Sequence, residues 1–358
     1  MTERPTLWQR ARGSKAIALG LRVAASTTML AVLVTRVRAS SERSDQPESV
    51  SILPAWHTST ALWFFGALGV AGFGAVLATW RWNRVLHAFD VSPPFRLLLS
   101  SYLAGLFVGN FLPSTVGGDV LRIRRSSAAI GDPGVAFASV LLERLTGWLV
   151  LPFLTLFTFL INPGLRELGR ATAVAFGVSL ATIAALSLIL AAANSHRMGG
   201  RLAGHGSWLR FLGAVHTGVR RLRERPADAL DVLAAGLAYQ LAVVISAWMA
   251  AHALGVRMSP TAALAFVPAV AVIQVMPLSI GGLGFREGAF ALFLGPLGVA
   301  NSRAIALGLC VYLINLLVSL AGAPAFALGG RNRHHRDDHV ATDHVATDAR
   351  PIPGKARS

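Results

Sequence analysis

The chain has 358 residues, of which 54% are hydrophobic and only 14% are charged. Soluble domains carry about 25% charged residues, so this composition excludes an ordinary soluble domain. The formal net charge of +16 would suit a nucleic-acid-binding protein, but the basic residues lie in loops between long apolar segments. That pattern encodes membrane topology. The composition therefore predicts an integral membrane protein without a nucleic-acid partner.

Nine apolar segments follow one another along the chain. Several are about 20 residues long, the length that crosses a hydrocarbon core about 30 Å thick. The segments lie at about 16–35, 60–80, 97–115, 134–162, 171–193, 229–254, 261–280, 285–299 and 303–328.

Loop charges predict which segments cross the membrane. Basic residues concentrate in the N-terminus, in 81–96, in 194–228 and in the tail after Gly330, and the positive-inside tendency places all four in the cytoplasm. An even number of crossings must then separate neighbouring cytoplasmic loops. The simplest solution makes 97–130 a re-entrant hairpin and 261–299 a second one, entered from the opposite side. We expect an all-α polytopic protein of the cell membrane, with about six full spans, two re-entrant helical hairpins and both termini cytoplasmic.

The two ends of the chain flank one predicted transmembrane domain, 16–330. The basic N-terminus, 1–15, precedes an apolar stretch without a clear small-x-small cleavage site, so we expect a retained span rather than a signal peptide. The polar tail, 331–358, repeats Asp-His-Val-Ala-Thr and is predicted to be disordered. Its histidines could bind a metal, but a solvated low-complexity tail is favoured, and we predict no metal or cofactor. Trp80 and Trp82 are predicted to be interface anchors.

One motif occurs twice. Asn110-Phe-Leu-Pro-Ser-Thr-Val-Gly-Gly-Asp-Val-Leu-Arg122 aligns without a gap with Gln274-Val-Met-Pro-Leu-Ser-Ile-Gly-Gly-Leu-Gly-Phe-Arg286, 164 residues later. The same offset carries neighbouring apolar segments onto each other, which predicts two copies of a span–hairpin–span unit, about 60–162 and 229–328. Three spans separate the copies, so they should have opposite orientations. Inverted repeats of this kind recur in secondary transporters.

The chemistry of the motif predicts a broken helix beside an arginine. Proline removes a backbone donor and Gly-Gly permits positive φ. Backbone freed in a membrane must be buried in protein or line a polar cavity, and N–H groups at the start of the next helix favour anions. Arg122 and Arg286 add donors suited to phosphate or carboxylate. The alternative is that Gly-Gly merely allows close helix packing and each arginine marks an interface, but the duplication favours function.

Ionisable residues inside a membrane are also functional candidates. Glu143 and Arg144 open an apolar run, where they could equally form a self-satisfied pair near the interface. Asp119 and Glu287 could couple protons, or pair with the motif arginines. No nucleotide-binding, zincin or hydrolase motif is present, so no catalytic residue is predicted. The candidate substrate-binding residues are Asn110, Ser114, Gly117, Gly118, Asp119, Arg122, Glu143, Arg144, Gln274, Ser279, Gly281, Gly282, Arg286 and Glu287.

Three stretches resemble the transmembrane region of the lysylphosphatidylglycerol synthases, a family also called flippase-like. They are the first motif, Glu143-Arg144-Leu-Thr-Gly147, and Pro277-Leu-Ser-Ile-Gly-Gly-Leu-Gly-Phe-Arg-Glu287. The resemblance covers about residues 15–330. It implies lipid handling, since this region is thought to flip aminoacylated lipid that a separate soluble domain makes. The present chain has only about thirty polar residues after its last apolar segment, so we do not expect synthase activity.

Together these features predict a protein that moves, or helps to move, an anionic phospholipid or a polyprenyl-phosphate-linked lipid across the membrane. The alternative is a membrane-embedded accessory subunit of a lipid-modifying or glycosyl-transferring enzyme. A third hypothesis, an intramembrane enzyme with Glu143 or Asp119 as its base, is weaker because no nucleophile–base pair is evident. The expected partners are membrane lipids and, in the alternative, that enzyme. The sequence does not predict the oligomeric state.

Overall fold

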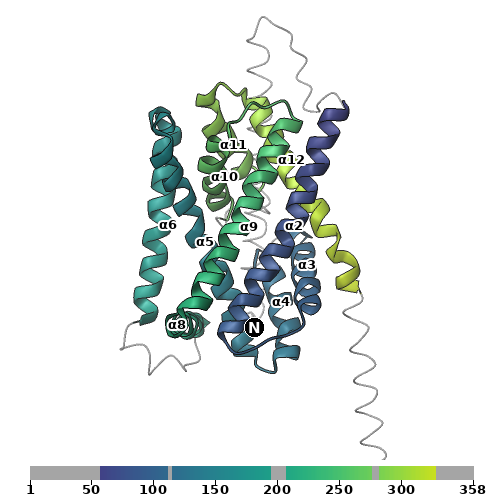
Figure 1. The fold of residues 1–358 in the computed structure, drawn as a ribbon, viewed down its shortest axis with the longest axis vertical. Helices are drawn as coiled ribbons and strands as arrows, with labels where there is room; N and C mark the ends of the chain where they lie inside the picture. The colour runs from purple at the N-terminus through teal and green to yellow at the C-terminus, as the bar shows by residue number, and fades with distance from the viewer. Residues whose placement is uncertain (1–56, 112–114, 195–206, 276–281, 328–358) are drawn as a thin grey trace, which may run out of the picture.

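The computed structural model describes residues 57–111, 115–194, 207–275 and 282–327 (Figure 1). Every regular element within these ranges is a helix. Five of them are long and apolar enough to cross a membrane. They are α2 (Thr58–Ala88), α5 (Pro133–Ile161), α6 (Arg170–Asn194), α9 (Pro226–Ala253) and α12 (Asn301–Leu320). The all-α polytopic prediction is thus confirmed, while the expected span at 16–35 and the tail lie outside the described residues.

Four shorter helices form the two hairpins that the loop charges predict. They are α3 (Phe95–Phe111), α4 (Thr115–Ile130), α10 (Pro260–Gln274) and α11 (Phe285–Leu294), the last followed by the 3₁₀ turn η2 (Gly295–Leu297). The α3–α4 pair lies in one end of the bundle and the α10–α11 pair in the other (Figure 1). Each hairpin therefore approaches the centre of the molecule from its own side.

The order of elements repeats along the chain. A long helix, a hairpin and a second long helix occur as α2 to α5 and again as α9 to α12. The first helices of the two sets, α2 and α9, pack side by side and run in opposite directions (Figure 1). This is the order that an inverted repeat predicts.

Side chains in the loops determine where α5 and α10 begin. The Oδ1 atom of Asp132 accepts hydrogen bonds from the backbone N–H groups of Gly134, at 2.7 Å, and Val135, at 3.2 Å. Ser259 Oγ accepts from Ala262 N–H at 3.1 Å. In both helices a proline follows the capping residue, where its missing N–H costs nothing.

Buried hydroxyl groups connect the long helices. Ser246 Oγ on α9 donates to the carbonyl of Ala67 on α2 at 2.9 Å, and Thr155 Oγ1 on α5 donates to the carbonyl of Ala265 on α10 at 2.9 Å. Phe266 of α10 stacks on Phe293 of α11, with ring centroids 5.0 Å apart. The last two contacts hold the second hairpin against α5 and within the main apolar core.

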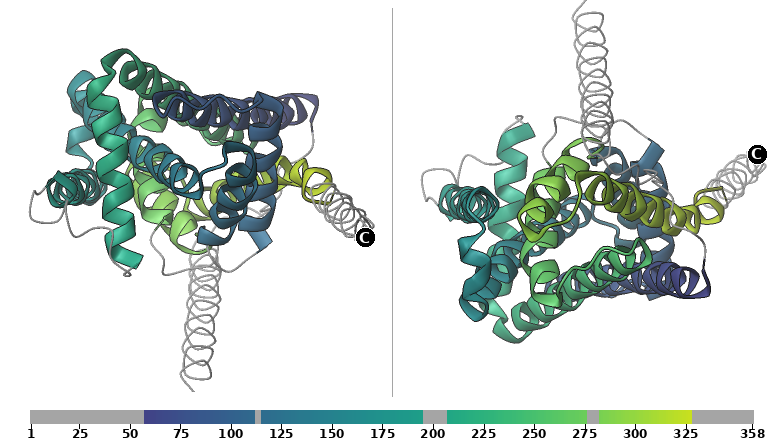
Figure 2. Two further views of the ribbon diagram at one scale, coloured as in Figure 1. Left: turned by 90° about the horizontal axis from the view of Figure 1, so that it is seen from below. Right: turned by 90° about the horizontal axis from the view of Figure 1, so that it is seen from above.

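Two regions assigned to loops from their charge are partly helical. Helix α2 continues to Ala88, so the first half of the 81–96 segment is helix, and Trp82 is completely buried rather than an interface anchor. Helix α8 (Ser207–Glu224) occupies much of the 194–228 segment and lies across the end of the bundle (Figures 1 and 2). Its Val215 packs in a cluster with Leu145 and Leu186. The segment was assigned to a loop because it is rich in arginine, although its apolar residues have the spacing of an amphipathic helix.

Candidate functional site

Both copies of the motif reach one cavity of about 400 Å³ between the helices. Residues of both hairpins and of the long helices around them line it. Among the predicted binding residues, those that line the cavity are Asn110, Gly118, Asp119, Arg122, Glu143, Arg144, Gln274 and Arg286. The structure therefore brings together side chains that are up to 176 residues apart in the sequence.

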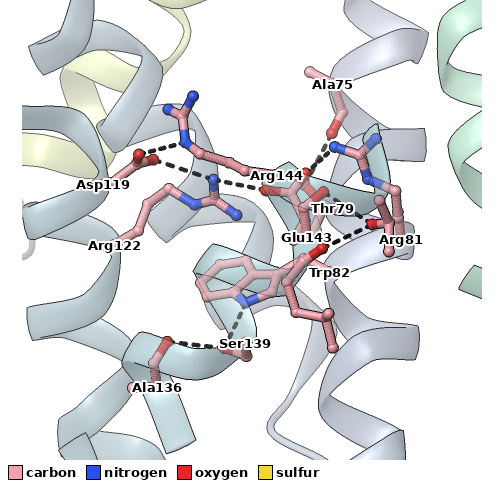
Figure 3. A network of polar contacts seen from close by, with 12 residues as sticks. Ala75, Thr79, Arg81, Trp82, Asp119, Arg122, Ala136, Ser139, Glu143 and Arg144 are labelled. Atoms are coloured by element: carbon pink, nitrogen blue, oxygen red, sulfur yellow. Dashed lines mark hydrogen bonds and ion pairs between the residues drawn. The ribbon is translucent and has the colours of Figure 1, made fainter. Parts of the chain in front are cut away.

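A chain of ion pairs crosses the wall of this cavity on the α3–α4 side (Figure 3). Glu143 on α5 pairs with Arg81 on α2, and its Oε2 lies 3.3 Å from Arg122 Nη1 on α4. Asp119 pairs with Arg144, and its Oδ1 lies 3.5 Å from Arg122 Nη1. Five charged side chains from three helices thus form one network.

Burial makes this pairing necessary. Arg81, Arg122 and Glu143 are 4%, 5% and 2% exposed, and an unpaired charge at such a site is strongly destabilising. The predicted self-satisfied Glu143–Arg144 pair does not form, because the two side chains have different partners. The predicted pairing of Asp119 with Arg122 is present.

Aromatic rings orient the cavity arginines. The guanidinium carbon of Arg122 lies 4.4 Å from the ring centre of Trp82 and 4.7 Å from that of Tyr102. The corresponding distances are 5.1 Å for Arg81 and Tyr239, and 4.9 Å for Arg286 and Tyr312. The chain has three tyrosines, and each lines the cavity beside a different arginine. Cation–π attraction limits the positions that each guanidinium can take.

Glycines provide the space for these side chains. A Cβ atom at Gly147 would lie 2.6 Å from Arg81 Nη1, and one at Gly105 would lie 2.7 Å from Arg122 Cγ. A Cβ atom at Gly118 would collide with the carbonyl oxygen of Gly105, so α3 and α4 approach closely at this point. Small residues at close helix contacts are typical of membrane proteins.

The arginine of the second motif is held differently. Arg286 donates from Nη2 and Nε to Glu287 Oε1, at 2.9 and 3.1 Å. The second carboxylate oxygen of Glu287 accepts from the Gly284 N–H at 2.6 Å. Glu287 is completely buried, so it pairs with Arg286 and also caps the start of α11.

The predicted helix breaks are only partly visible. Gly117 and Gly118 lie inside α4, and neither has a positive φ, which corrects the prediction that this Gly-Gly pair breaks the helix. The corresponding Gly282 does have a positive φ of 76°. Helix α4 begins at Thr115, so Gly118 lies within the helix and serves close packing against Gly105 of α3 instead. Ser114, Ser279 and Gly281 lie outside the described residues. At the start of α11, the N–H of Gly284 is bonded to Glu287 and that of Arg286 to the Gly282 carbonyl, so these two groups are not free for an anion.

Some donors of the cavity arginines have no acceptor on the described part of the chain. Four of them are Nε and Nη1 of Arg81 and Nε and Nη2 of Arg122, while outside the cavity the same holds for Nε of Arg84. All four atoms are buried, and a buried donor without a partner costs about 1–3 kcal/mol. An anion in the cavity would supply acceptors for them.

The sequence interpretation missed several cavity residues. Arg81, Tyr102, Tyr239, Gln240 and Tyr312 all line the cavity, and none of them belongs to the repeated motif. Arg81 was assigned to a loop. The signal for a helix was the apolar spacing of Ala78, Trp82 and Val85, all buried. Within the described ranges, no three His, Cys, Asp or Glu residues are grouped so that they could hold a metal ion.

Comparison with known proteins agrees with the geometry. A search of the curated proteins finds no match for this chain. The family model described as the lysylphosphatidylglycerol synthase TM region matches residues 17–322. This match includes both motifs and every helix that lines the cavity. The chain therefore belongs to the family of the lysylphosphatidylglycerol synthase transmembrane region.

Proposed function

We propose that this protein moves lipids with an anionic headgroup across the cell membrane. The observation that carries the proposal is the set of buried guanidinium donors of Arg81 and Arg122 that face no protein acceptor among the described residues. Guanidinium groups bind phosphate through charge-assisted hydrogen bonds. A lipid phosphate in the cavity would accept these bonds and would also balance the excess of positive charge.

The charges around the cavity favour an anionic lipid over an aminoacylated one. Four arginines line it: Arg81, Arg122, Arg144 and Arg286. The acids of the network are Asp119 and Glu143, with Glu287 behind Arg286, so these side chains carry a formal charge of +1. An aminoacyl headgroup brings an ammonium group that the arginines would repel. The proposed substrate thus differs from the lipid that the full-length synthases are thought to flip.

The architecture provides a path for such a lipid. The two hairpins approach the cavity from opposite ends of the bundle (Figure 1), as in transporters whose binding site lies near the midplane between repeats. Exposed apolar side chains on α2, such as Leu62, Phe65 and Phe73, give the acyl chains an apolar surface outside the bundle. The headgroup would cross through the protein while the chains stay in lipid.

The test measures the movement of fluorescent phosphatidylglycerol in proteoliposomes containing the purified protein. The substitutions Arg81→Gln and Arg122→Gln should each slow movement at least about tenfold, because a hydrogen bond to a charged group is worth about 1.5–3 kcal/mol. Arg84→Gln is the matched control. Arg84 lies one turn from Arg81 on α2 and its Nε is also a buried donor without an acceptor, but it pairs with Asp231 at 3.5 Å outside the cavity, so it separates the cavity position from an unpaired donor as such.

Two results would contradict the proposal. One is an unchanged rate in both cavity variants. The other is the absence of lipid movement with the unaltered protein, which would instead favour the accessory-subunit role. Thermal unfolding of each variant is monitored by dye labelling of the half-buried Cys310. A variant that moves lipid slowly but unfolds at the normal temperature has lost lipid binding and has kept its fold.

A further inference from the structure

The cavity wall contains neutral hydrogen-bonding groups as well as arginines. Gln240 on α9 is 7% exposed and lines the cavity next to Tyr239. The amides of Asn110 and Gln274, one from each motif, also line it. Amide groups both donate and accept hydrogen bonds, as tyrosine hydroxyl groups do. A bare phosphate needs donors only, so these side chains offer more than phosphate recognition requires.

The neutral groups lie next to the arginines that have unpaired donors. The Tyr239 ring lies against the Arg81 guanidinium and the Tyr102 ring against that of Arg122. The side chains of Tyr102 and Tyr239 both line the cavity. The two anion-binding groups are therefore bordered, on the α3 and α9 sides, by groups that can exchange hydrogen bonds with hydroxyl groups.

The size of the cavity also favours a ligand that is larger than a phosphate group and carries hydroxyl groups. A volume of about 400 Å³ lies within the range of about 300–1,000 Å³ found for small-molecule sites, and it exceeds what one phosphate group fills. The Gln240 amide lines this space, and a ligand that covered it without offering a polar partner would bury it unfavourably. A substituent on the phosphate that carries several hydroxyl groups would fill the space and match these polar groups.

We propose that the cavity selects a phosphodiester lipid whose headgroup is rich in hydroxyl groups, a polyol or a sugar. Arg81 and Arg122 hold the phosphate oxygens, and Gln240 and Tyr239 exchange hydrogen bonds with the headgroup hydroxyls. This inference rests on the proposed function, and it narrows the substrate class. The same headgroup chemistry occurs on diacylglycerol lipids and on polyprenyl phosphates, and the experiment distinguishes these two sources.

The test is equilibrium binding to the purified full chain in detergent, using two pairs of lipids matched in charge. The first pair is phosphatidylinositol and phosphatidylmethanol. The second pair is a polyprenyl phosphohexose and the corresponding polyprenyl methyl phosphate. In at least one pair, the hydroxyl-bearing member should bind at least about tenfold more tightly, because a site with buried polar groups rejects a ligand that leaves them unpaired. The lipid pair that shows the preference identifies the apolar part of the substrate, either diacylglycerol or polyprenyl.

Variants test the assignment of residues. Gln240→Leu and Tyr239→Phe should each reduce the preference to less than about threefold by weakening the binding of the hydroxyl-bearing lipid. Thr182→Val, on α6 outside the cavity, should leave the preference intact. Tyr239→Phe keeps the ring beside Arg81, so it remains informative if Gln240→Leu fails to fold.

Equal affinities within both pairs would overturn the inference, and so would no measurable binding of any of the four lipids. A preference that survives in both variants would overturn the roles of Gln240 and Tyr239. Because binding is measured without transport, these outcomes are independent of the proteoliposome assay. Lipid movement without headgroup preference would retain the proposed function and reject only this substrate class.

Discussion

The two copies of the motif differ most in how they hold their arginines. Arg122 contacts acids and rings from several helices: Asp119 on its own helix, Glu143 on α5, Trp82 on α2 and Tyr102 on α3. Arg286 instead pairs with the adjacent Glu287, whose other oxygen caps α11. The same sequence position therefore belongs to a shared network in one copy and to a local pair in the other.

This difference indicates a division of roles between the halves. The acids around Arg122 are divided among Arg81, Arg122 and Arg144, so donors remain for a ligand. The acid beside Arg286 is not shared with another described arginine, and it is fixed by a backbone N–H. We infer that the first half binds the anion more strongly, while the second half forms the opposite wall.

The largest contrast between the halves is their expected orientation. In a Cys310→Ser background, cysteines at Ala129, in the last turn of the first hairpin, and at Arg257, before the second hairpin, should react with a membrane-impermeant thiol reagent from opposite sides. Both positions are exposed, and they lie at opposite ends of the bundle, as the positive-inside tendency predicts for the two faces. Labelling of sealed right-side-out and inverted vesicles gives the measurement.

Ala129→Cys should react only in inverted vesicles and Arg257→Cys only in right-side-out ones. Reaction of both from one side would contradict the inverted repeat. Detergent-solubilised protein, in which both cysteines should react, is the control for accessibility.

A smaller contrast concerns the stability that each buried acid provides. Glu143→Gln leaves Arg81 and Arg122 without their shared carboxylate, and breaking a buried ion pair costs about 3–5 kcal/mol. Glu287→Gln should cost less, because its amide oxygen can still accept from Gly284 N–H and only Arg286 loses a counter-ion. Thermal unfolding followed through Cys310 measures both.

A double variant tests the reason for this ranking. Adding Arg81→Gln to Glu143→Gln removes one of the uncompensated charges, so the double variant should be more stable than additivity predicts. Additive effects, or a larger loss for Glu287→Gln than for Glu143→Gln, would show that the Arg122 network is not the more strongly coupled of the two.

Much of the fold was predictable because membranes impose strong rules. The lengths of the apolar segments predicted the long helices. The loop charges predicted the two hairpins and their placement at opposite ends of the bundle. Helix α8 was missed because its arginines satisfied the rule for cytoplasmic loops, although Val215, Val219 and Leu222 follow helical spacing. A charge rule assigns the side of the membrane and says little about secondary structure.

The site was predictable only where the motif repeats. Duplication identified Arg122 and Arg286, together with their amides and neighbouring acids. Arg81 has no counterpart in the motif, and its role depends on α2 packing against α5 beside Gly147. Contacts between helices that are distant in sequence have no local pattern, so the ion-pair network and the three arginine–tyrosine contacts required the structure.

The smallest contrast lies at the second glycine of each motif. Gly118→Ala should cost about 1–3 kcal/mol, because the new Cβ collides with the Gly105 carbonyl and the α3–α4 backbones must separate. Gly282→Ala should cost about 1–2 kcal/mol, since its φ of 76° is strained for other residues. Gly109→Ala is the control: it meets nothing within 4 Å, and alanine favours a helix by up to about 1 kcal/mol, so this variant should be unchanged or slightly more stable. If Gly118→Ala behaved like Gly109→Ala in thermal unfolding, α3 and α4 could not be packed as closely as described, and the position of Arg122 beside Gly105 would have to be revised.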